Sequence, residues 1–303
     1  MGNLAMLSNL ARGCVDDGPG LRTVIYTKGC TLHCAWCHNP QTISSQPQVM
    51  HFATSCVGCG ACEKLCPACF GMQGKTARLN PSACNACGSC ADLCLTDAIQ
   101  FCGTRVSAKE LWPVIERDIP YFRRSEGGVT VSGGECLLYP GFLQELFALC
   151  HKHRVHTAIE TALNVDTDAL KAVMGLTDLV IMDLKILDDQ LHRQYTGATN
   201  RKILSNARLV LKQHPEVLVR VPLIPGVNDD PSSLQEIAQW VSAHRPEAKI
   251  ELLRYNDTAK NRYLALKLPY RDFGSPQDKQ TLDRLTTDLQ KRFPNIKISH
   301  NGK

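Results

Sequence analysis

The sequence predicts an α/β fold in which about six parallel β-strands alternate with α-helices, with a cysteine-rich module inserted after the first strand. From residue 105 onward, short apolar segments rich in β-branched residues alternate with segments of helical periodicity. Residues 48–104 break this alternation and contain two runs of four cysteines each. We therefore expect residues 1–47 and 105–303 to form the α/β part and residues 48–104 to form the insert.

Six segments have the composition of buried strands, namely residues 23–29, 129–135, 156–161, 178–185, 217–226 and 249–255. Helical periodicity is found in residues 142–153, 166–174, 202–213 and 232–243. Parallel strands joined by helical crossovers form either a partial barrel or an open sheet.

Polar and glycine residues follow the apolar part of five of these strands, in the stretches KGC, SGGE, ET, DLK and RVPLIPG. In a barrel, the corresponding positions lie together at the C-terminal mouth, where such folds build their active sites. One or two of them could be simple turn residues, but five in the same register favour a common site.

The composition is that of an ordinary globular protein, with 44% hydrophobic and 21% charged residues in 303 residues. The net charge of +5 is dispersed along the chain, so no nucleic-acid-binding stripe is expected. No run approaches the roughly 18 apolar residues of a membrane span, and the N-terminus does not resemble a signal peptide. We expect a cytoplasmic protein that binds no membrane, whose cysteines are metal ligands rather than disulfides.

The two cysteine runs, CVGCGACEKLCP (56–67) and CNACGSCADLCL (84–95), share the spacing Cys-x2-Cys-x2-Cys-x3-Cys. This spacing is typical of bacterial ferredoxins with [4Fe–4S] clusters, whereas zinc sites usually pair two separated Cys-x2-Cys knuckles. In two-cluster ferredoxins the fourth cysteine of each run serves the other cluster. The predicted ligand sets are Cys56, Cys59, Cys62 and Cys94 for one cluster, and Cys84, Cys87, Cys90 and Cys66 for the other. Cys69 could compete with Cys66, and Leu95 replaces the usual proline.

A third group, KGCTLHCAWCHNP (28–40), contains only three cysteines, Cys30, Cys34 and Cys37. Three thiolates leave one iron of a [4Fe–4S] cluster without a protein ligand, so that an exogenous chelating ligand can bind there.

The spacing Cys-x3-Cys-x2-Cys resembles the signature of the radical S-adenosylmethionine (SAM) enzymes. Trp36 occupies the aromatic position between the last two cysteines, and His38 begins the ending HNP. SGGEC (132–136) is similar to the family's Gly-Gly-Glu strand end, with Gly133, Gly134 and Glu135 matching. Cys136 replaces the more frequent proline and is either a spare thiol or a small packing residue. The resemblance implies that Trp36, Cys37, His38 and the three Gly-Gly-Glu residues contact SAM.

Five stretches of the sequence together resemble the glycyl-radical enzyme activating enzymes. These stretches are VDDGPGLRT, TVSGGE, AIET, MDLK and RVPLIPGVND. The resemblance covers about residues 15–263 and implies a partial (β/α)6 TIM-like barrel with an inserted ferredoxin-like 2[4Fe–4S] module. It also implies reductive cleavage of SAM to methionine and a 5′-deoxyadenosyl radical, which abstracts the Cα hydrogen of a glycine in a partner enzyme.

The same resemblance implies roles for residues at the strand ends. Asp17 belongs to the turn beside the entering glycyl loop, and Glu160 and Thr161 lie at a monovalent cation site beside the cofactor carboxylate. The other expected catalytic or cofactor-binding residues are Asp183, Leu184 and Lys185 near the methionyl end, Arg220 at the next strand, and Asn256 where members of the family commonly have a histidine. An ordinary strand-end salt bridge is the alternative for Asp183 and Lys185.

The expected cofactors are three [4Fe–4S] clusters, SAM and a monovalent cation near Glu160. The expected partners of the monomer are a glycyl-radical enzyme and a low-potential electron donor such as flavodoxin or ferredoxin, in an anaerobic reaction. Two other classes stay open. A radical SAM enzyme acting on another peptide or a small molecule would share the three cysteines and the Gly-Gly-Glu stretch, and a ferredoxin-type electron-transfer protein would explain only the insert.

Overall fold

The computed structural model describes residues 3–302, and its centre is a row of seven parallel strands. Each strand pairs with the next one along the row, in the order β2, β8, β9, β10, β11, β12 and β13. Their bounds are Arg22–Thr27, Gly128–Gly133, His156–Thr161, Leu179–Asp183, Val217–Pro222, Lys249–Leu253 and Lys297–His300. The row contains the six expected strands in sequence order and adds β13, which the sequence did not predict.

Two antiparallel strands extend the sheet beyond β2. These are β1 (Leu4–Cys14), which pairs with β2, and β7 (Thr104–Ser107), which pairs with β1. The sheet therefore runs from β13 at one end to β7 at the other, an arrangement that agrees with a partial barrel.

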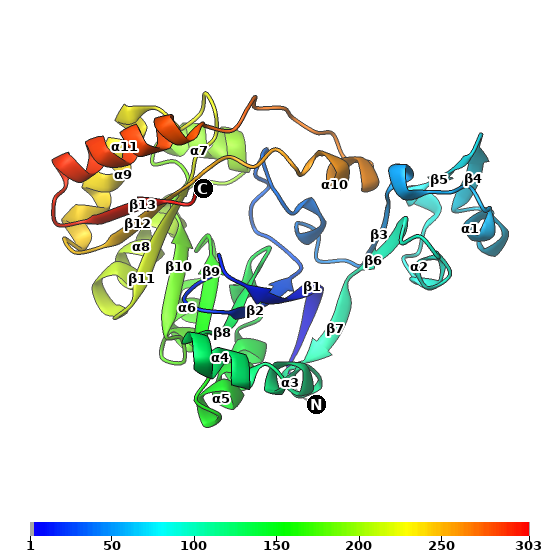
Figure 1. Cartoon of the computed structure of the whole chain (residues 1–303), viewed down its shortest axis with the longest axis horizontal. Helices are drawn as coiled ribbons and strands as arrows, with labels where there is room; N and C mark the ends of the chain where they lie inside the picture. The colour runs from blue at the N-terminus through cyan, green and yellow to red at the C-terminus, as the bar shows by residue number, and fades with distance from the viewer. Residues whose placement is uncertain (1–2, 303) are drawn as a thin grey trace.

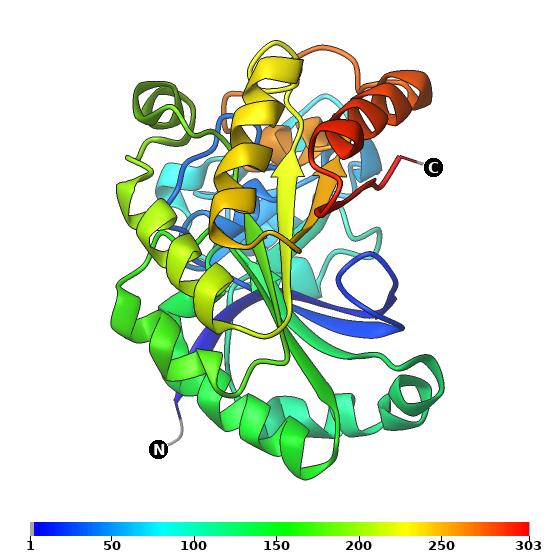
Figure 2. The same ribbon diagram turned by 90° about the vertical axis from the view of Figure 1, so that its left-hand side faces the viewer.

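The helices that follow the strands cover the outer face of the sheet (Figures 1 and 2). The four expected helices are α5 (Pro140–Lys152), α6 (Thr167–Met174), α8 (Arg201–Gln213) and α9 (Pro231–His244). The others outside the insert are α3 (Ala108–Glu116), α4 (Ile119–Ser125), α7 (Asp189–Thr196), α10 (Lys260–Ala265) and α11 (Lys279–Arg292). None of the helices in residues 3–302 is both long and apolar enough to span a bilayer.

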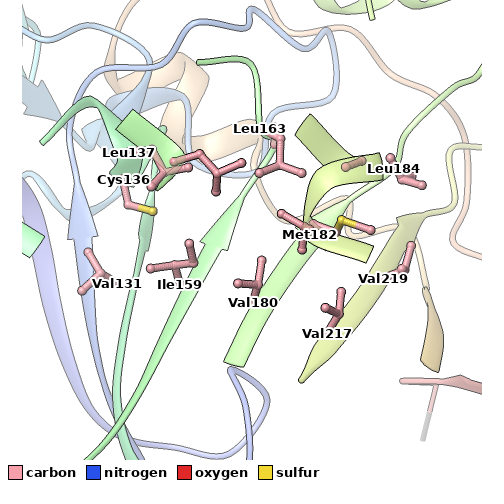
Figure 3. Packing of buried hydrophobic residues seen from close by; sticks show 14 of the residues in the cluster. Val131, Cys136, Leu137, Ile159, Leu163, Val180, Met182, Leu184, Val217 and Val219 are labelled. Atoms are coloured by element: carbon pink, nitrogen blue, oxygen red, sulfur yellow. The ribbon is translucent and has the colours of Figure 1, made fainter. Parts of the chain in front are cut away.

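The main hydrophobic core lies between the sheet and these helices. Figure 3 shows alternate residues of neighbouring strands side by side in this layer, among them Val131, Ile159, Val180 and Val217. All four side chains are buried, because parallel strands covered by crossover helices expose little of that face to water.

The insert begins and ends in a pair of antiparallel strands, β3 (Gln48–His51) and β6 (Ile99–Cys102). Between them lie the hairpin β4–β5 (Phe70–Gln73 and Thr76–Leu79) and the short helices α1 (Ala61–Leu65) and α2 (Ser89–Asp92). The two cysteine runs have the same local form, since each short helix follows a glycine with left-handed backbone, Gly60 or Gly88. The insert has its own small core and lies beside the sheet, with α10 packed against β3 (Figure 1).

Candidate active site

A cavity of about 400 Å³ lies at the C-terminal ends of the parallel strands. This is the mouth at which barrels of this kind bind their ligands. Most of the predicted site residues line it, namely Asp17, Cys30, Cys34, Trp36, Cys37, His38, Gly133, Gly134, Glu160, Thr161, Asp183, Lys185 and Asn256. Of the residues predicted for this site, three do not line the cavity: Glu135, Leu184 and Arg220.

The loop that contains the three cysteines is held on two sides by backbone hydrogen bonds. Cys30 N–H donates to the carbonyl of Ile43 at 2.9 Å, and His33 N–H donates to the carbonyl of Thr196 at 2.8 Å. Lys28, which the sequence did not single out, is fully buried beneath the loop. Its ammonium donates to the carbonyls of Gln41 and Ser44 at 2.6 and 2.8 Å, so it joins the loop to the segment that follows it.

The three thiols fit a ligand set for an iron–sulfur cluster. Burial raises the pKa of Cys30 and Cys34 to about 12 and that of Cys37 to about 11, so a thiolate here requires a cationic partner such as iron. The Leu32 N–H donates to the Cys30 sulfur at 3.4 Å, a contact that favours the thiolate. Within residues 3–302, no three His, Cys, Asp or Glu side chains are grouped closely enough for a single metal ion.

The Gly-Gly stretch packs its backbone directly against the start of the cysteine loop. Gly133 has a left-handed φ of 114°, and a Cβ atom on Gly134 would lie 2.1 Å from the Gly29 carbonyl oxygen. Side chains are thus excluded at both positions, which leaves the backbone open to the cavity.

Glu135 lies beneath the cavity rather than in it. Its carboxylate accepts hydrogen bonds from the Thr161 hydroxyl at 2.7 Å and from the N–H groups of Leu137 and Ala162 at 3.2 and 3.1 Å. Burial raises the pKa of this carboxyl to about 7. In the structure, Glu135 therefore positions Thr161 and the adjoining turn, while Thr161 itself lines the cavity.

Asp183 and Lys185 form an ion pair inside the cavity, with 2.5 Å between the Lys185 Nζ and the Asp183 Oδ2. Burial opposes the charge of Lys185, but the attraction of Asp183 outweighs it and raises the pKa of the ammonium. The Asp183 Oδ1 is buried without a hydrogen-bond partner among the described residues, so one polar atom of the pair is free for a ligand. Leu184 between them points into the core and is 2% exposed (Figure 3).

Arg220 of β11 lies below the cavity, between a carboxylate of the adjacent strand β12 and a carboxylate of β9, which lies beyond β10. It donates to Glu160 and Glu251 at 2.7 Å each and also to the carbonyl of Asp16. Burial disfavours the Glu160 charge, but Arg220 more than compensates and lowers the Glu160 pKa. The second Glu160 oxygen accepts from the Ser132 hydroxyl at 2.5 Å.

Asp17 extends this charge network to the cavity wall. Burial and the nearby Glu160 raise the pKa of Asp17 to about 6, although Arg220 acts in the opposite direction.

His38 and Asn256 are linked through Thr258. The Thr258 hydroxyl donates to the Asn256 Oδ1 at 2.7 Å and lies 3.1 Å from the His38 Nε2. The Arg262 guanidinium also lies 3.4 Å from the His38 Nε2 and donates to the His38 carbonyl at 2.8 Å. The link ties the cysteine loop to the segment that follows β12.

Comparisons with known proteins agree with this geometry. The model of the radical SAM superfamily matches residues 24–241. The (2S)-3-sulfopropanediol dehydratase activating enzyme of Klebsiella oxytoca is 36% identical to this chain, over 88% of the chain and 86% of that enzyme. The choline trimethylamine-lyase activating enzyme of Oleidesulfovibrio alaskensis is 34% identical, over 98% of both chains. The chain belongs to the glycyl-radical enzyme activating enzymes of the radical SAM superfamily.

A solved structure shows the same fold at low sequence identity. A radical SAM methyltransferase from Sphaerobacter thermophilus aligns with 99% of this activating enzyme and 78% of its own chain, with a TM-score of 0.55 and 12% identity.

The sequence did not predict the aromatic residues that surround Trp36 in this activating enzyme. Trp36 lies 5.9 Å from the Tyr195 ring and 6.0 Å from the Phe273 ring, measured between centroids. The guanidinium of Arg271 lies 5.0 Å from the Tyr195 ring and 4.8 Å from the Phe273 ring. The irregular segment between α10 and α11 therefore supports Trp36, which lines the cavity.

Cys136 is fully buried, and its thiol lies 3.4 Å from the Glu160 carbonyl oxygen. Burial raises its pKa well above the ordinary value. Of the two alternatives for this residue, the structure favours packing over a reactive spare thiol.

The insert cysteines come together in part. Cys56, Cys59, Cys62 and Cys94, the four ligands predicted for one cluster, line a common cavity of about 70 Å³, which Cys90 also lines. Of the other set, Cys84 and Cys66 pack on the insert core and Cys87 is exposed. The structure joins Cys66 to Cys69 by a disulfide, whereas the sequence predicts Cys66 as a ligand, so that assignment stays a prediction.

Proposed function

We propose that the cavity at the strand ends binds SAM against a [4Fe–4S] cluster held by Cys30, Cys34 and Cys37, and that the partner's glycine enters beside Asp17. One observation carries the proposal: the three partly buried thiols, the side-chain-free Gly133–Gly134 backbone and the Asp183–Lys185 pair line one cavity. When bound, the cluster supplies the electron that cleaves SAM to methionine and a 5′-deoxyadenosyl radical.

The residues of the chain would bind SAM, orient it and keep water away from it. The Asp183–Lys185 pair and the Gly-Gly backbone match the polar methionyl end of SAM, and Trp36 is suited to packing near its adenine. Leu223, Ile224 and Leu253 also line the cavity and keep part of its wall apolar. A hydrogen atom is transferred rather than a proton, so positioning and dryness are needed and no general base is required.

We also propose that the insert holds two further [4Fe–4S] clusters that pass electrons from a low-potential donor, such as flavodoxin or ferredoxin, to the active site. Two observations support this proposal: the repeated local form of the two cysteine runs, and the cavity that cysteines of both runs share. The enzyme would then contain three clusters. We further propose that it works as a monomer in the cytoplasm under anaerobic conditions.

The partner is proposed to be a glycyl-radical enzyme. The relatives activate enzymes as different as a sulfopropanediol dehydratase and a choline trimethylamine-lyase, so the family leaves the partner's own reaction open. A monovalent cation beside Glu160 and Thr161 belongs to the same proposal. Such a cation would share Glu160 with Arg220 and Ser132.

An anaerobic assay tests the proposal. The reconstituted protein is mixed with SAM, dithionite and candidate glycyl-radical enzymes, and 5′-deoxyadenosine and the glycyl radical are measured by chromatography and electron paramagnetic resonance. Cleavage without a glycyl radical in any candidate would favour a radical SAM enzyme with another substrate, and no cleavage would reject both enzyme functions.

Replacing Cys34 with alanine should abolish cofactor cleavage while most of the absorbance of the insert clusters remains. Cys150→Ala is the matched control, because Cys150 is a buried cysteine of α5 outside the cavity and outside all three cysteine groups. Loss of cleavage in both variants would indicate a general loss of folding instead.

A further inference from the structure

The turn formed by Asp16 to Gly20 has no regular secondary structure, yet three of its backbone carbonyls have polar partners from outside the turn. The Asp16 carbonyl accepts from Arg220, and the Asp17 carbonyl accepts from the Thr130 hydroxyl at 2.7 Å. The Pro19 carbonyl lies 3.5 Å from an amino group of Arg22. A turn held in this way keeps one conformation without a helix or a strand.

Arg22 takes part in this arrangement directly, through the Pro19 carbonyl, and indirectly, through Thr130. Its side chain is fully buried, and no carboxylate in residues 3–302 forms an ion pair with it. Instead, the guanidinium donates to the Thr130 hydroxyl at 2.9 Å and to the Val129 carbonyl at 2.5 Å, and it lies 3.0 Å from the His156 Nδ1. A buried arginine with neutral acceptors costs stability, so its fixed fork of donors points to a geometric role.

Thr130 connects Arg22 to Asp17. Its single hydroxyl accepts from the Arg22 Nε and donates to the Asp17 carbonyl, so both of these hydrogen bonds depend on one oxygen atom. The Asp17 side chain lines the active-site cavity, whereas Arg22 and Thr130 do not.

We propose that Arg22 and Thr130 are positioning residues that fix the Asp16–Gly20 turn in the conformation that receives the glycine-bearing loop of the partner. They act through the backbone of Asp17 and contact neither SAM nor the reacting atoms. The contact with the partner rests on the proposed function, whereas the bracing of the turn does not.

The test is hydrogen exchange of the full-length reconstituted protein, read at the Leu21 amide, which directly follows the turn and donates to the Ser125 hydroxyl at 2.9 Å. Thr130→Val keeps the shape of the side chain but removes the hydroxyl, and it should accelerate exchange at Leu21 about tenfold. Thr130→Ser keeps the hydroxyl and should restore slow exchange. Thr177→Val removes another buried hydroxyl, which donates to the Val173 carbonyl of α6, and should leave exchange at Leu21 as in the wild type.

Amides of α9 report whether each variant is folded. Thr130→Ala tests the same hydroxyl in a smaller residue if the valine variant does not fold. Wild-type exchange at Leu21 in a folded valine or alanine variant would overturn the bracing. The bracing would also be overturned if the serine variant exchanged as fast as the valine variant.

The second readout is the ratio of glycyl radical formed to SAM cleaved, measured with a glycyl-radical enzyme that the wild type activates. This ratio should fall about tenfold in Thr130→Val and recover in Thr130→Ser. An unchanged ratio beside accelerated exchange would overturn the role in receiving the partner. If the wild type activates no glycyl-radical enzyme, the proposed function fails while the exchange result on the turn still stands.

Discussion

Replacing Gly134 with alanine should destabilise the fold and damage the active site. The new Cβ would lie 2.1 Å from the Gly29 carbonyl oxygen and 2.6 Å from the Thr42 carbonyl oxygen. The shortest comfortable carbon–oxygen contacts are about 3.3 Å, so the backbone must move by roughly 1 Å. Both obstructing atoms belong to the backbone and cannot rotate away.

The expected cost follows from these contacts. Overpacking a core costs about 1–3 kcal/mol, and the movement also strains the hydrogen bonds from Gly29 N–H to Thr42 and from Glu135 N–H to Gly29, worth about 1 kcal/mol each. We expect the free energy of unfolding to fall by about 3–5 kcal/mol. Because Gly29 precedes Cys30, SAM cleavage should also fall steeply.

Urea unfolding of the cluster-free, reduced protein and SAM cleavage by the reconstituted protein measure the two effects. Gly175→Ala is the control, since a Cβ there meets nothing within 4 Å and the backbone φ is −71°. The reasoning is refuted if Gly134→Ala unfolds within about 1 kcal/mol of this control and cleaves SAM at the wild-type rate.

Three further predictions concern charges and packing around the cavity. The pKa of Asp17 is raised to about 6, so its ionisation destabilises the fold increasingly as the pH rises from about 4 to 6 and fully above 6. At pH 8, the free energy of unfolding of Asp17→Asn, measured with urea, should therefore exceed that of the wild type by about 1–2 kcal/mol after solvent screening. At pH 4 the two proteins should have equal stability. Arg220→Met leaves Glu160 and Glu251 buried without their cation and should cost about 3–5 kcal/mol in urea unfolding, with a smaller loss if both glutamates become glutamine. Phe273→Ala removes a ring that supports Trp36 and should weaken SAM binding several-fold in equilibrium dialysis of the reconstituted protein, with little loss of cluster iron.

The regular part of the fold could be predicted because each central strand carries its own signal. The stretch VTV of β8 and the stretch VIM of β10 are rich in β-branched residues and buried throughout, as central strands of a parallel sheet usually are. β13 and β1 lacked this signal. β13 is a four-residue strand with alternating burial, and β1 mixes polar residues and glycine. Both strands join the sheet by pairing with a neighbouring strand, and a local sequence pattern carries no information about such pairing.

The site was predictable where a motif is contiguous, as in the cysteine loop and the Gly-Gly stretch. It was not predictable where a side chain finds partners far along the chain. Arg220 pairs with Glu160 and Glu251, 60 and 31 residues away, and nothing in the sequence around Glu251 marks it. Glu135 follows the two glycines but points beneath the cavity, because Thr161 and the adjoining turn supply its hydrogen-bond donors there.

Two cationic side chains at this end of the sheet are paired with carboxylates, and this pairing bears on the chemistry. Arg220 is held by Glu251 of the adjacent strand β12 and by Glu160 of β9, and Lys185 by the aspartate two residues before it. Buried charges that are paired stay fixed, whereas unpaired ones would draw water in or change protonation. A reactive carbon radical abstracts the nearest available hydrogen, so a rigid wall limits its targets. On the proposed function, the ion pairs that hold the strand ends together would therefore also favour transfer to the one glycine that the partner presents.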